Sequence, residues 1–150
     1  MELILWRHAE AIDGFPDQGR PLTKKGLKQA ELMASFLTPQ LPSDTRILVS
    51  PALRAQQTAR ALTKKFTTEP AINVHATPQA VINAVGWPLA TRTTLLVGHQ
   101  PWIGEVAALL LSGKPDSWNV KKGAIWWFSQ RTKEGGHLTS LRLVISPDYL

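Results

Sequence analysis

Apolar and polar positions along the chain follow two periods, one typical of buried strands and the other of amphipathic helices. Leu3–Trp6 is a short continuous apolar run, and similar runs occupy residues 46–50 and 93–98. Short runs of this kind, bounded by polar or turn residues, are typical of strands inside a parallel sheet. A further short strand is predicted at 71–74, "AINV". The pattern predicts strands that are each followed by a polar connection or a helix.

Helical periodicity fills the segments between these strands. After Thr23, apolar residues recur at the three- and four-residue spacing of a helix until "TPQLPSD" ends the pattern. Ser50–Pro51 and Thr77–Pro78 each predict a helix start, because Ser and Thr cap helices and Pro fits the first turn. The helix after Ser50 is expected to continue to Phe66. Another helix is predicted at 101–111, "PWIGEVAALLL".

The pattern changes beyond Ser112. The segments "AIWWFSQ" (124–130) and "HLTSLRLVI" (137–145), separated by "RTKEGG", predict an antiparallel hairpin. Strands alternating with helices and closed by a hairpin favour an α/β fold, a three-layer αβα sandwich whose mostly parallel sheet has an antiparallel edge. No repeat, linker or low-complexity tract interrupts the chain, so residues 1–150 are expected to form a single domain.

Composition narrows the classes of protein. The chain has no cysteine, which excludes disulfides, a thiolate zinc site and a cysteine nucleophile. Its start lacks the features of a signal peptide and no apolar stretch is long enough to span a bilayer, so a cytoplasmic protein without membrane contact is expected. The net charge is +6, but the basic residues are scattered in ones and twos. This distribution favours a solvated positive surface over a nucleic-acid partner.

Polar side chains follow three of the predicted strands. Arg7 and His8 follow the first, Arg54 lies in the first turn of the helix after the second, and His99 lies between the last parallel strand and its helix. In open α/β sheets, ligands bind beyond the carboxyl ends of the strands. We therefore expect these four side chains to meet at one edge of the sheet.

Two arginines and two histidines at one place suit phosphoryl transfer. Guanidinium groups match phosphate oxygens, and a neutral imidazole can attack phosphorus. Nearby arginines favour the neutral ring, because like charges lower the pKa of a histidine. A phosphohistidine at His8 is expected, with its charge compensated by Arg7, Arg54 and a protonated His99. A catalytic metal is disfavoured because arginines repel divalent cations and no metal-binding motif occurs.

Four motifs together resemble a known family. "LWRHAEA" resembles the arginine–histidine motif that opens the histidine phosphatase superfamily, and "RPLTKKG", "VSPALRAQQTA" and "LLVGHQPWIGEVAALL" follow in that superfamily's order and spacing. The short length and the "RPLT" segment are most similar to the SixA-type phosphohistidine phosphatases. The resemblance implies a phosphoglycerate mutase-like fold without metal or organic cofactor.

The resemblance also assigns roles to individual residues. His8 would be the phosphorylated nucleophile, Arg7 and Arg54 would bind the phosphoryl oxygens, and His99 would stabilise the transferring group. Arg20, in "RPLT", would take a secondary anion-binding or loop-fixing role.

Two departures from the family pattern bear on the substrate. Ala9 stands where the superfamily usually has glycine, so the backbone there needs no positive φ. Many members carry a glutamate general acid after the third strand, but residues 72–87 contain no carboxylate, and Asp13, Asp17 and Glu69 are the nearest candidates. His75 in this segment is expected to be structural or exposed. Because imidazole is a better leaving group than an alkoxide, the missing acid favours N–P bonds over phosphate esters.

The sequence therefore predicts a metal-independent phosphatase with a phosphohistidine intermediate, acting on phosphohistidine in a protein of the histidine phosphotransfer type. A phosphatase of small phosphate monoesters is the alternative with the same chemistry. A non-catalytic module that binds phosphate or nucleic acid is less favoured, since all four catalytic positions hold competent residues.

Overall fold

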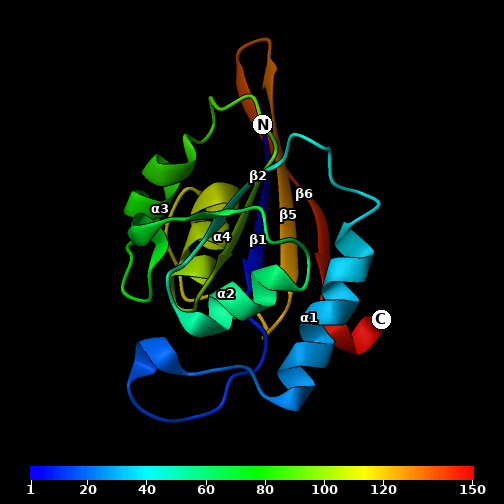
Figure 1. The fold of residues 1–150 in the computed structure, drawn as a ribbon. Coiled ribbons are helices and arrows are strands. Elements are labelled where there is room, and N and C mark those ends of the chain that lie inside the picture. Colours follow the sequence, from blue (N-terminus) through cyan, green and yellow to red (C-terminus); the bar gives the residue numbers. More distant parts are fainter.

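The computed structural model describes residues 1–150 and contains a six-stranded sheet of order β3-β2-β4-β1-β5-β6 (Figure 1). The strands are β1 (Glu2–Arg7), β2 (Arg46–Val49), β3 (Thr67–Thr68), β4 (Thr94–Gly98), β5 (Ile125–Lys133) and β6 (Gly136–Ile145). The helices are α1 (Lys24–Leu37), α2 (Leu53–Arg60), α3 (Pro78–Val85) and α4 (Trp102–Ser112). Three short 3-10 turns are η1 (Asp17–Gly19), η2 (Pro70–Ile72) and η3 (Pro147–Tyr149).

The four strands β1 to β4 are parallel, and the C-terminal hairpin adds antiparallel pairs. β4 lies between β1 and β2, and β3 extends the sheet beyond β2. β5 pairs antiparallel with β1, and β6 pairs antiparallel with β5. The predicted α/β class, with a mostly parallel sheet and an antiparallel edge, is confirmed.

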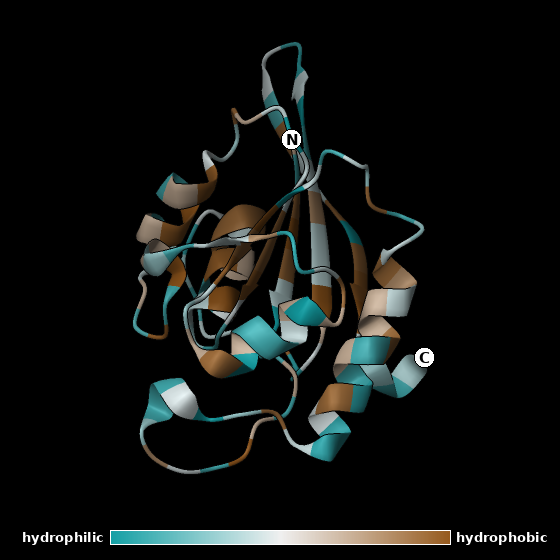
Figure 2. Ribbon diagram, viewed as in Figure 1, coloured by the Kyte–Doolittle hydropathy of each residue, from teal (hydrophilic) through white to brown (hydrophobic).

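Two apolar layers pack on the two faces of the sheet. Met33, Leu37 and Ala59 of α1 and α2 pack on one face, whereas Val81 of α3 and Val106 of α4 pack on the other. The central strands and α4 are accordingly apolar in Figure 2, and the tip of the hairpin is polar. Helices on both faces complete the three-layer arrangement that the strand–helix alternation predicted.

The strand register places the ends of the parallel strands level with one another. Arg7 at the end of β1 pairs with Gly98 at the end of β4, and Val49 at the end of β2 pairs with Val97. The residues that follow these strands therefore leave the sheet at one edge.

The start of α1 holds the first loop against the sheet edge. Thr23 caps the helix as predicted, since its Oγ1 accepts a hydrogen bond of 2.9 Å from the Gly26 amide and donates one of 2.8 Å to Glu10. A Cβ at Gly26 would lie 2.0 Å from the Glu10 carbonyl oxygen, so only glycine permits this close approach.

The helix α2 differs from its prediction at both ends. It begins at Leu53 after an extended Ala52, and it ends at Arg60 rather than at Phe66. The Ser50 hydroxyl does not cap the helix, because it accepts only the Ala52 amide at 3.2 Å and is otherwise held by His99. Phe66 lies beyond the helix and still packs against the core.

The prediction of a strand at residues 71–74 is wrong. The sheet instead ends in β3 at Thr67–Thr68, and residues 70–72 form the turn η2. Pro70 explains the change, since its ring fixes φ and supplies no amide for a strand ladder.

The hairpin is longer than predicted, because Gly135 and Gly136 take positive φ and confine the turn to 134–135.

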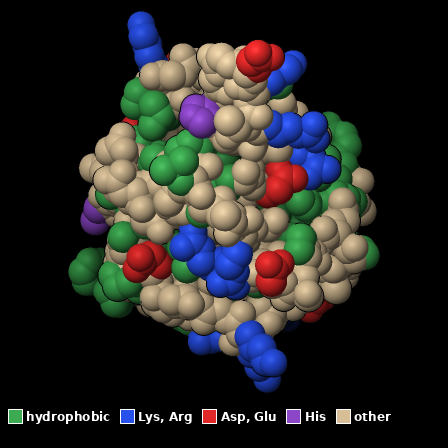
Figure 3. Space-filling model, turned by 90° about the horizontal axis from the view of Figure 1, so that it is seen from above, with side chains coloured by type: hydrophobic (Ala, Val, Ile, Leu, Met, Phe, Trp, Pro, Cys, Tyr) green, Lys and Arg blue, Asp and Glu red, His purple; other side chains and the backbone are tan.

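The charge distribution agrees with the scattered pattern in the sequence. Seen from above the molecule of Figure 1, Lys and Arg side chains occur in separate groups with acidic side chains among them (Figure 3). None of the helices combines the length and the hydropathy that a bilayer-spanning segment requires.

Candidate active site

The structure brings the four predicted side chains together at the carboxyl ends of β1, β2 and β4. The ring centroids of His8 and His99 lie 5.2 Å apart. His8, Arg54 and His99 are buried, with 7%, 3% and 1% of their surface exposed, and Arg7 is half-buried beside them. Three segments that are far apart in the sequence thus form one polar cluster.

Backbone hydrogen bonds fix the position of His8. Its amide donates to the Gly98 carbonyl at 3.0 Å, and its carbonyl accepts from the Gly123 amide at 3.1 Å. The following Ala9 is fully buried and donates its amide to Thr58 Oγ1 at 3.0 Å. The nucleophile predicted from the sequence is therefore held between β4, α2 and the loop before β5.

The tautomer of His8 follows from a single contact. Nδ1 lies 2.7 Å from the Ala9 carbonyl oxygen, which can only accept, so Nδ1 must carry the proton. In a neutral ring, the lone pair is then on Nε2. His8 presents the nitrogen that a nucleophile requires.

Burial and neighbouring charge keep His8 neutral. Desolvation, together with the charges of Arg54 and Arg7, lowers the pKa of His8 to about 3, although the hydrogen bond to the Ala9 carbonyl opposes this. The lone pair on Nε2 is therefore available at neutral pH. This is the state that attack on phosphorus needs.

His99 is oriented by Ser50, a residue that the sequence analysis assigned to a helix cap. Nε2 of His99 lies 2.6 Å from the Ser50 hydroxyl oxygen, and Nδ1 is buried without a partner in the protein. Desolvation, followed by the charges of His8 and Arg54, lowers the pKa of His99 to about 3. The hydrogen bond to Ser50 uses Nε2, so Nδ1 is the ring nitrogen of His99 that is left for a ligand.

Each arginine is fixed by a carbonyl and keeps a buried nitrogen unpaired. Arg7 Nη1 donates to the Val120 carbonyl and Arg54 Nη1 to the Asp17 carbonyl, both at 2.7 Å. Nε of both arginines is buried without a hydrogen-bond partner in the protein. Desolvation, and then the charge of Arg54, lowers the pKa of Arg7. Unpaired buried donors are costly in a folded protein, so these groups indicate an anion-binding site.

Arg20 fixes the first loop. Its Nε donates to the Ile12 carbonyl at 2.9 Å, and its two terminal nitrogens lie 3.2 Å from Asp17 and 3.5 Å from Asp13. All these partners belong to the loop between β1 and α1. These contacts fit the loop-fixing part of the role predicted for Arg20.

Asp17 forms an ion pair with the anion site itself. Its carboxylate lies 3.1 Å from Arg54 Nη2 and 3.2 Å from Arg20 Nη1. Desolvation would raise its pKa, but the hydrogen bonds from Arg20 and Arg54 outweigh it and hold the pKa below the usual value. In this position Asp17 is anionic, which does not suit the general-acid role considered for it.

A hollow of about 500 Å³ adjoins this cluster. One wall is formed by the first loop around Asp17 and the other by the segment after β3, including Asn73 and His75. Asn73 Oδ1 lies 3.5 Å from the Ser50 hydroxyl, so this wall touches the residue that orients His99. Sequence reasoning missed Ser50 and Asn73, whose only signal is a polar residue placed beyond a strand.

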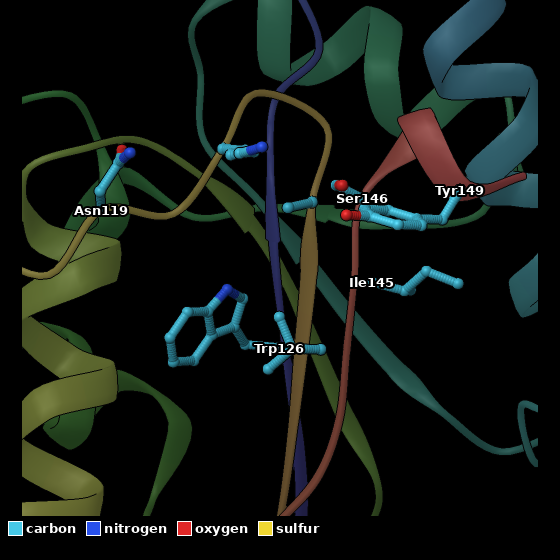
Figure 4. Close-up of a pocket in the computed structure, with 8 residues that line it drawn as sticks. Asn119, Trp126, Ile145, Ser146 and Tyr149 are labelled. Carbon is cyan, nitrogen blue, oxygen red and sulfur yellow. The ribbon is translucent and has the colours of Figure 1, made fainter.

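A second hollow differs from this cluster in the kind of side chains that line it. It measures about 490 Å³ and is lined mainly by apolar side chains, and Figure 4 shows the Trp126 ring pointing from β5 toward α4. It contains no histidine or arginine. No group of three or more His, Asp or Glu side chains in residues 1–150 is arranged to hold a metal ion.

Comparisons with known proteins identify the family. Residues 3–79 match the model of the histidine phosphatase superfamily (branch 1). The phosphohistidine phosphatase SixA of Escherichia coli is 32% identical over 123 residues, which cover 76% of each chain. A SixA homolog from Haemophilus influenzae is 32% identical over 126 residues, 73% of this chain and 77% of its own.

Solved structures agree with the fold. The structure of the protein histidine phosphatase SixA complexed with tungstate superposes with a TM-score of 0.82 at 26% identity and covers 99% of both chains. The structure described as a putative phosphohistidine phosphatase SixA from Agrobacterium tumefaciens has a TM-score of 0.79 at 21% identity, over 97% of this chain and 98% of that one. The predicted fold family is thereby confirmed.

Proposed function

Since the chain belongs to the histidine phosphatase superfamily, we propose that it is a phosphatase that removes the phosphoryl group from phosphohistidine in proteins. The observation that carries this proposal is the placement of a neutral His8, with its Nε2 lone pair free, beside buried nitrogens of Arg7, Arg54 and His99 that have no partner in the protein. The likeness to SixA, a phosphohistidine phosphatase by name, supports the substrate class.

The reaction would proceed in two displacements at phosphorus. In the first, the Nε2 lone pair of His8 forms a bond to phosphorus while the P–N bond of the substrate breaks, and that electron pair stays with the leaving imidazole. In the second, water attacks phosphorus and the electron pair of the His8–phosphorus bond returns to Nε2. Phosphate is released and His8 is restored.

Arg7, Arg54 and His99 would compensate the charge of the transferring group. Their unpaired nitrogens, Nε of both arginines and Nδ1 of His99, are preorganised by contacts to Val120, Asp17 and Ser50. Donors fixed before the reaction need no reorganisation when charge develops on the phosphoryl oxygens. Arg20 would contribute by holding Asp17 and the first loop in place.

An exposed apolar surface beside the site favours a protein substrate over a small ester. Phe15 is 97% exposed and Ile12 is 48% exposed, and both lie in the loop that contributes Asp17. Hydrogen bonds from Arg20 to Ile12 and Asp17 anchor this loop. A folded protein that presents its phosphohistidine to His8 can cover these side chains, whereas a small phosphate ester cannot.

The cytoplasmic location predicted from the sequence stays a prediction.

The test is phosphate release from a phosphorylated histidine phosphotransfer protein. The wild-type protein is expected to release phosphate and the His8→Ala variant to release none above background. His137→Ala, which removes a histidine from the hairpin strand β6, is the matched control and should behave as wild type. Equal release by wild type and His8→Ala would refute the proposal.

Small phosphate monoesters provide the second arm of the test. We expect alkyl phosphates to be turned over far more slowly than phosphohistidine, because an alkoxide is a much more basic leaving group than imidazole and its bond to phosphorus breaks less readily. Faster turnover of alkyl phosphates would instead favour the monoester alternative.

A further inference from the structure

The hollow beside the anion site offers space for a leaving group. It is bounded by residues 16–18 of the first loop and by the segment 70–76. Asp17 on one wall bonds Arg54, and Asn73 on the other contacts Ser50, so both walls reach the cluster around His8. The cluster itself is buried. A substituent on a phosphoryl group held there has room in this hollow, whose two walls both contact the cluster.

His75 is the histidine on the wall of that hollow. It lies in the segment between η2 and α3, on the wall that faces Asp17, and its side chain is exposed. Asn73, two residues earlier, fixes the segment through its carbonyl, which accepts the Trp102 indole at 3.1 Å, and through its side chain near Ser50. The imidazole is thus carried by a wall that is anchored to the catalytic cluster.

The other ionisable groups around the hollow cannot supply a proton to the leaving group. Asp17 is anionic in its ion pairs with Arg20 and Arg54. His8 is used for attack, His99 is buried with Nε2 bonded to Ser50, and neither ring lines the hollow. Glu10, which accepts from Thr23, lies outside the lining of the hollow, as do the other acidic candidates Asp13 and Glu69. An imidazole can both donate and accept a proton, which makes it a suitable acid and base for this position.

We propose that His75 is the proton donor for the leaving group and the proton acceptor for the attacking water. This inference rests on the proposed phosphatase function and adds a catalytic residue to it. It also revises the expectation that His75 has only a structural or surface role. The sequence carries no carboxylate in this segment, and the structure puts an imidazole on the wall where a proton is needed.

The proton balance closes over the two steps. As the substrate P–N bond breaks, the imidazolium form of His75 gives its proton to the free ring nitrogen of the leaving imidazole, which departs neutral. The now neutral His75 then takes a proton from water as the water oxygen bonds to phosphorus. The His8–phosphorus bond breaks, phosphate leaves, and His75 is again an imidazolium.

The experiment compares leaving groups in His75 variants. His75→Gln and His75→Asn are assayed on phosphoimidazole, on an alkyl phosphate and on nitrophenyl phosphate, whose leaving group departs without a proton. We expect kcat/KM for phosphoimidazole and the alkyl phosphate to fall by about 10²-fold or more, as loss of a general acid does. The fall for nitrophenyl phosphate is expected to be at least about tenfold smaller.

A matched variant and a folding measurement keep the outcomes distinct. His137→Gln removes a histidine from the hairpin and is expected to leave all three rates at the wild-type value. A His75 variant with a wild-type melting temperature that loses the same factor on all three substrates, or loses nothing, overturns the inference. A wild-type protein that releases no phosphate from any substrate, by contrast, overturns the proposed function itself.

Discussion

The Ser50 hydroxyl oxygen lies 2.6 Å from Nε2 of His99, so the residue that follows β2 sets the orientation of the residue that follows β4. Both residues are fully buried, or nearly so. The contact leaves Nδ1 of His99 as a buried nitrogen without a hydrogen-bond partner in the protein. Ser50, which is not itself one of the reacting groups, thereby fixes the geometry of His99, which is.

Removal of the Ser50 hydroxyl should impair catalysis. Ser50→Ala is expected to lower kcat on the phosphorylated protein by roughly tenfold, since one buried hydrogen bond contributes about 0.5–1.5 kcal/mol and holds the His99 ring in its orientation. Steady-state kinetics measures the change. Ser129→Ala, on β5, is the control and should leave kcat unaltered. An unimpaired Ser50→Ala enzyme would contradict this role.

Neutralising Asp17 should strengthen the binding of inorganic phosphate. The Asp17 carboxylate occupies Arg54 Nη2 and repels a dianion, whereas the Arg54 contact to the Asp17 backbone carbonyl does not depend on the side chain. In Asp17→Asn, the phosphate Kd measured by calorimetry is expected to fall by roughly five- to tenfold, about 1–1.4 kcal/mol. Weaker binding would mean that the carboxylate mainly positions Arg54.

Stability of the free protein should decline in mild acid. The folded-state pKa of both His8 and His99 is about 3, below the ordinary value of 6.5, so the unfolded chain binds more protons between these limits. The contribution of these two histidines to the free energy of unfolding is therefore fully present above pH 6.5, and it is lost as the pH is lowered toward 3. Each histidine contributes a slope of up to about 1.4 kcal/mol per pH unit.

Denaturant titrations across this pH range measure that slope. His8→Asn is expected to remove about half of it. His137→Asn should leave it intact, because the ring of His137 is exposed. A slope that is the same in wild type and His8→Asn would contradict the buried, neutral state assigned to His8.

Two glycines, Gly19 at the end of η1 and Gly26 in the first turn of α1, should respond differently to substitution by alanine. A Cβ at Gly26 would lie 2.0 Å from the Glu10 carbonyl oxygen, whereas a Cβ at Gly19 would meet nothing closer than 3.8 Å. Gly26→Ala is expected to destabilise the fold by about 1–3 kcal/mol through overpacking. Gly19→Ala should be near neutral. Melting temperatures measure both, and equal values would show that α1 can shift without cost.

The exposed Phe15 should matter only for a protein substrate. Phe15→Ala is expected to lower kcat/KM for a phosphorylated protein by about tenfold or more, since burial of an aromatic side chain contributes about 1.5–3 kcal/mol. The same variant should turn over phosphoimidazole at the wild-type rate. Leu89→Ala is the control, because Leu89 is 82% exposed in the connection that leads into the amino end of β4. A parallel loss on both substrates would argue against docking on Phe15.

Local sequence was sufficient for most elements and failed where a tertiary contact competes with a local preference. Thr23 and Thr77 cap their helices as predicted, because each hydroxyl has only the helix amides and nearby groups to bond. Ser50 has the same local pattern but a different neighbour, since His99 comes within hydrogen-bonding distance only after β2 and β4 pair. Pro70 likewise prevents the strand that the apolar residues at 71–74 suggested.

The amino-acid sequence by itself determined which side chains follow the parallel strands, and with them the chemistry of the site. Arg7, His8, Arg54 and His99 were identified there because strand ends are encoded by local apolar runs. Only the tertiary structure decided the orientation of His99, the state of Asp17 and the position of His75 on the wall of the hollow. Hydrogen bonds and charge pairs between residues distant in the sequence act over a few ångströms, and only the folded chain sets those distances.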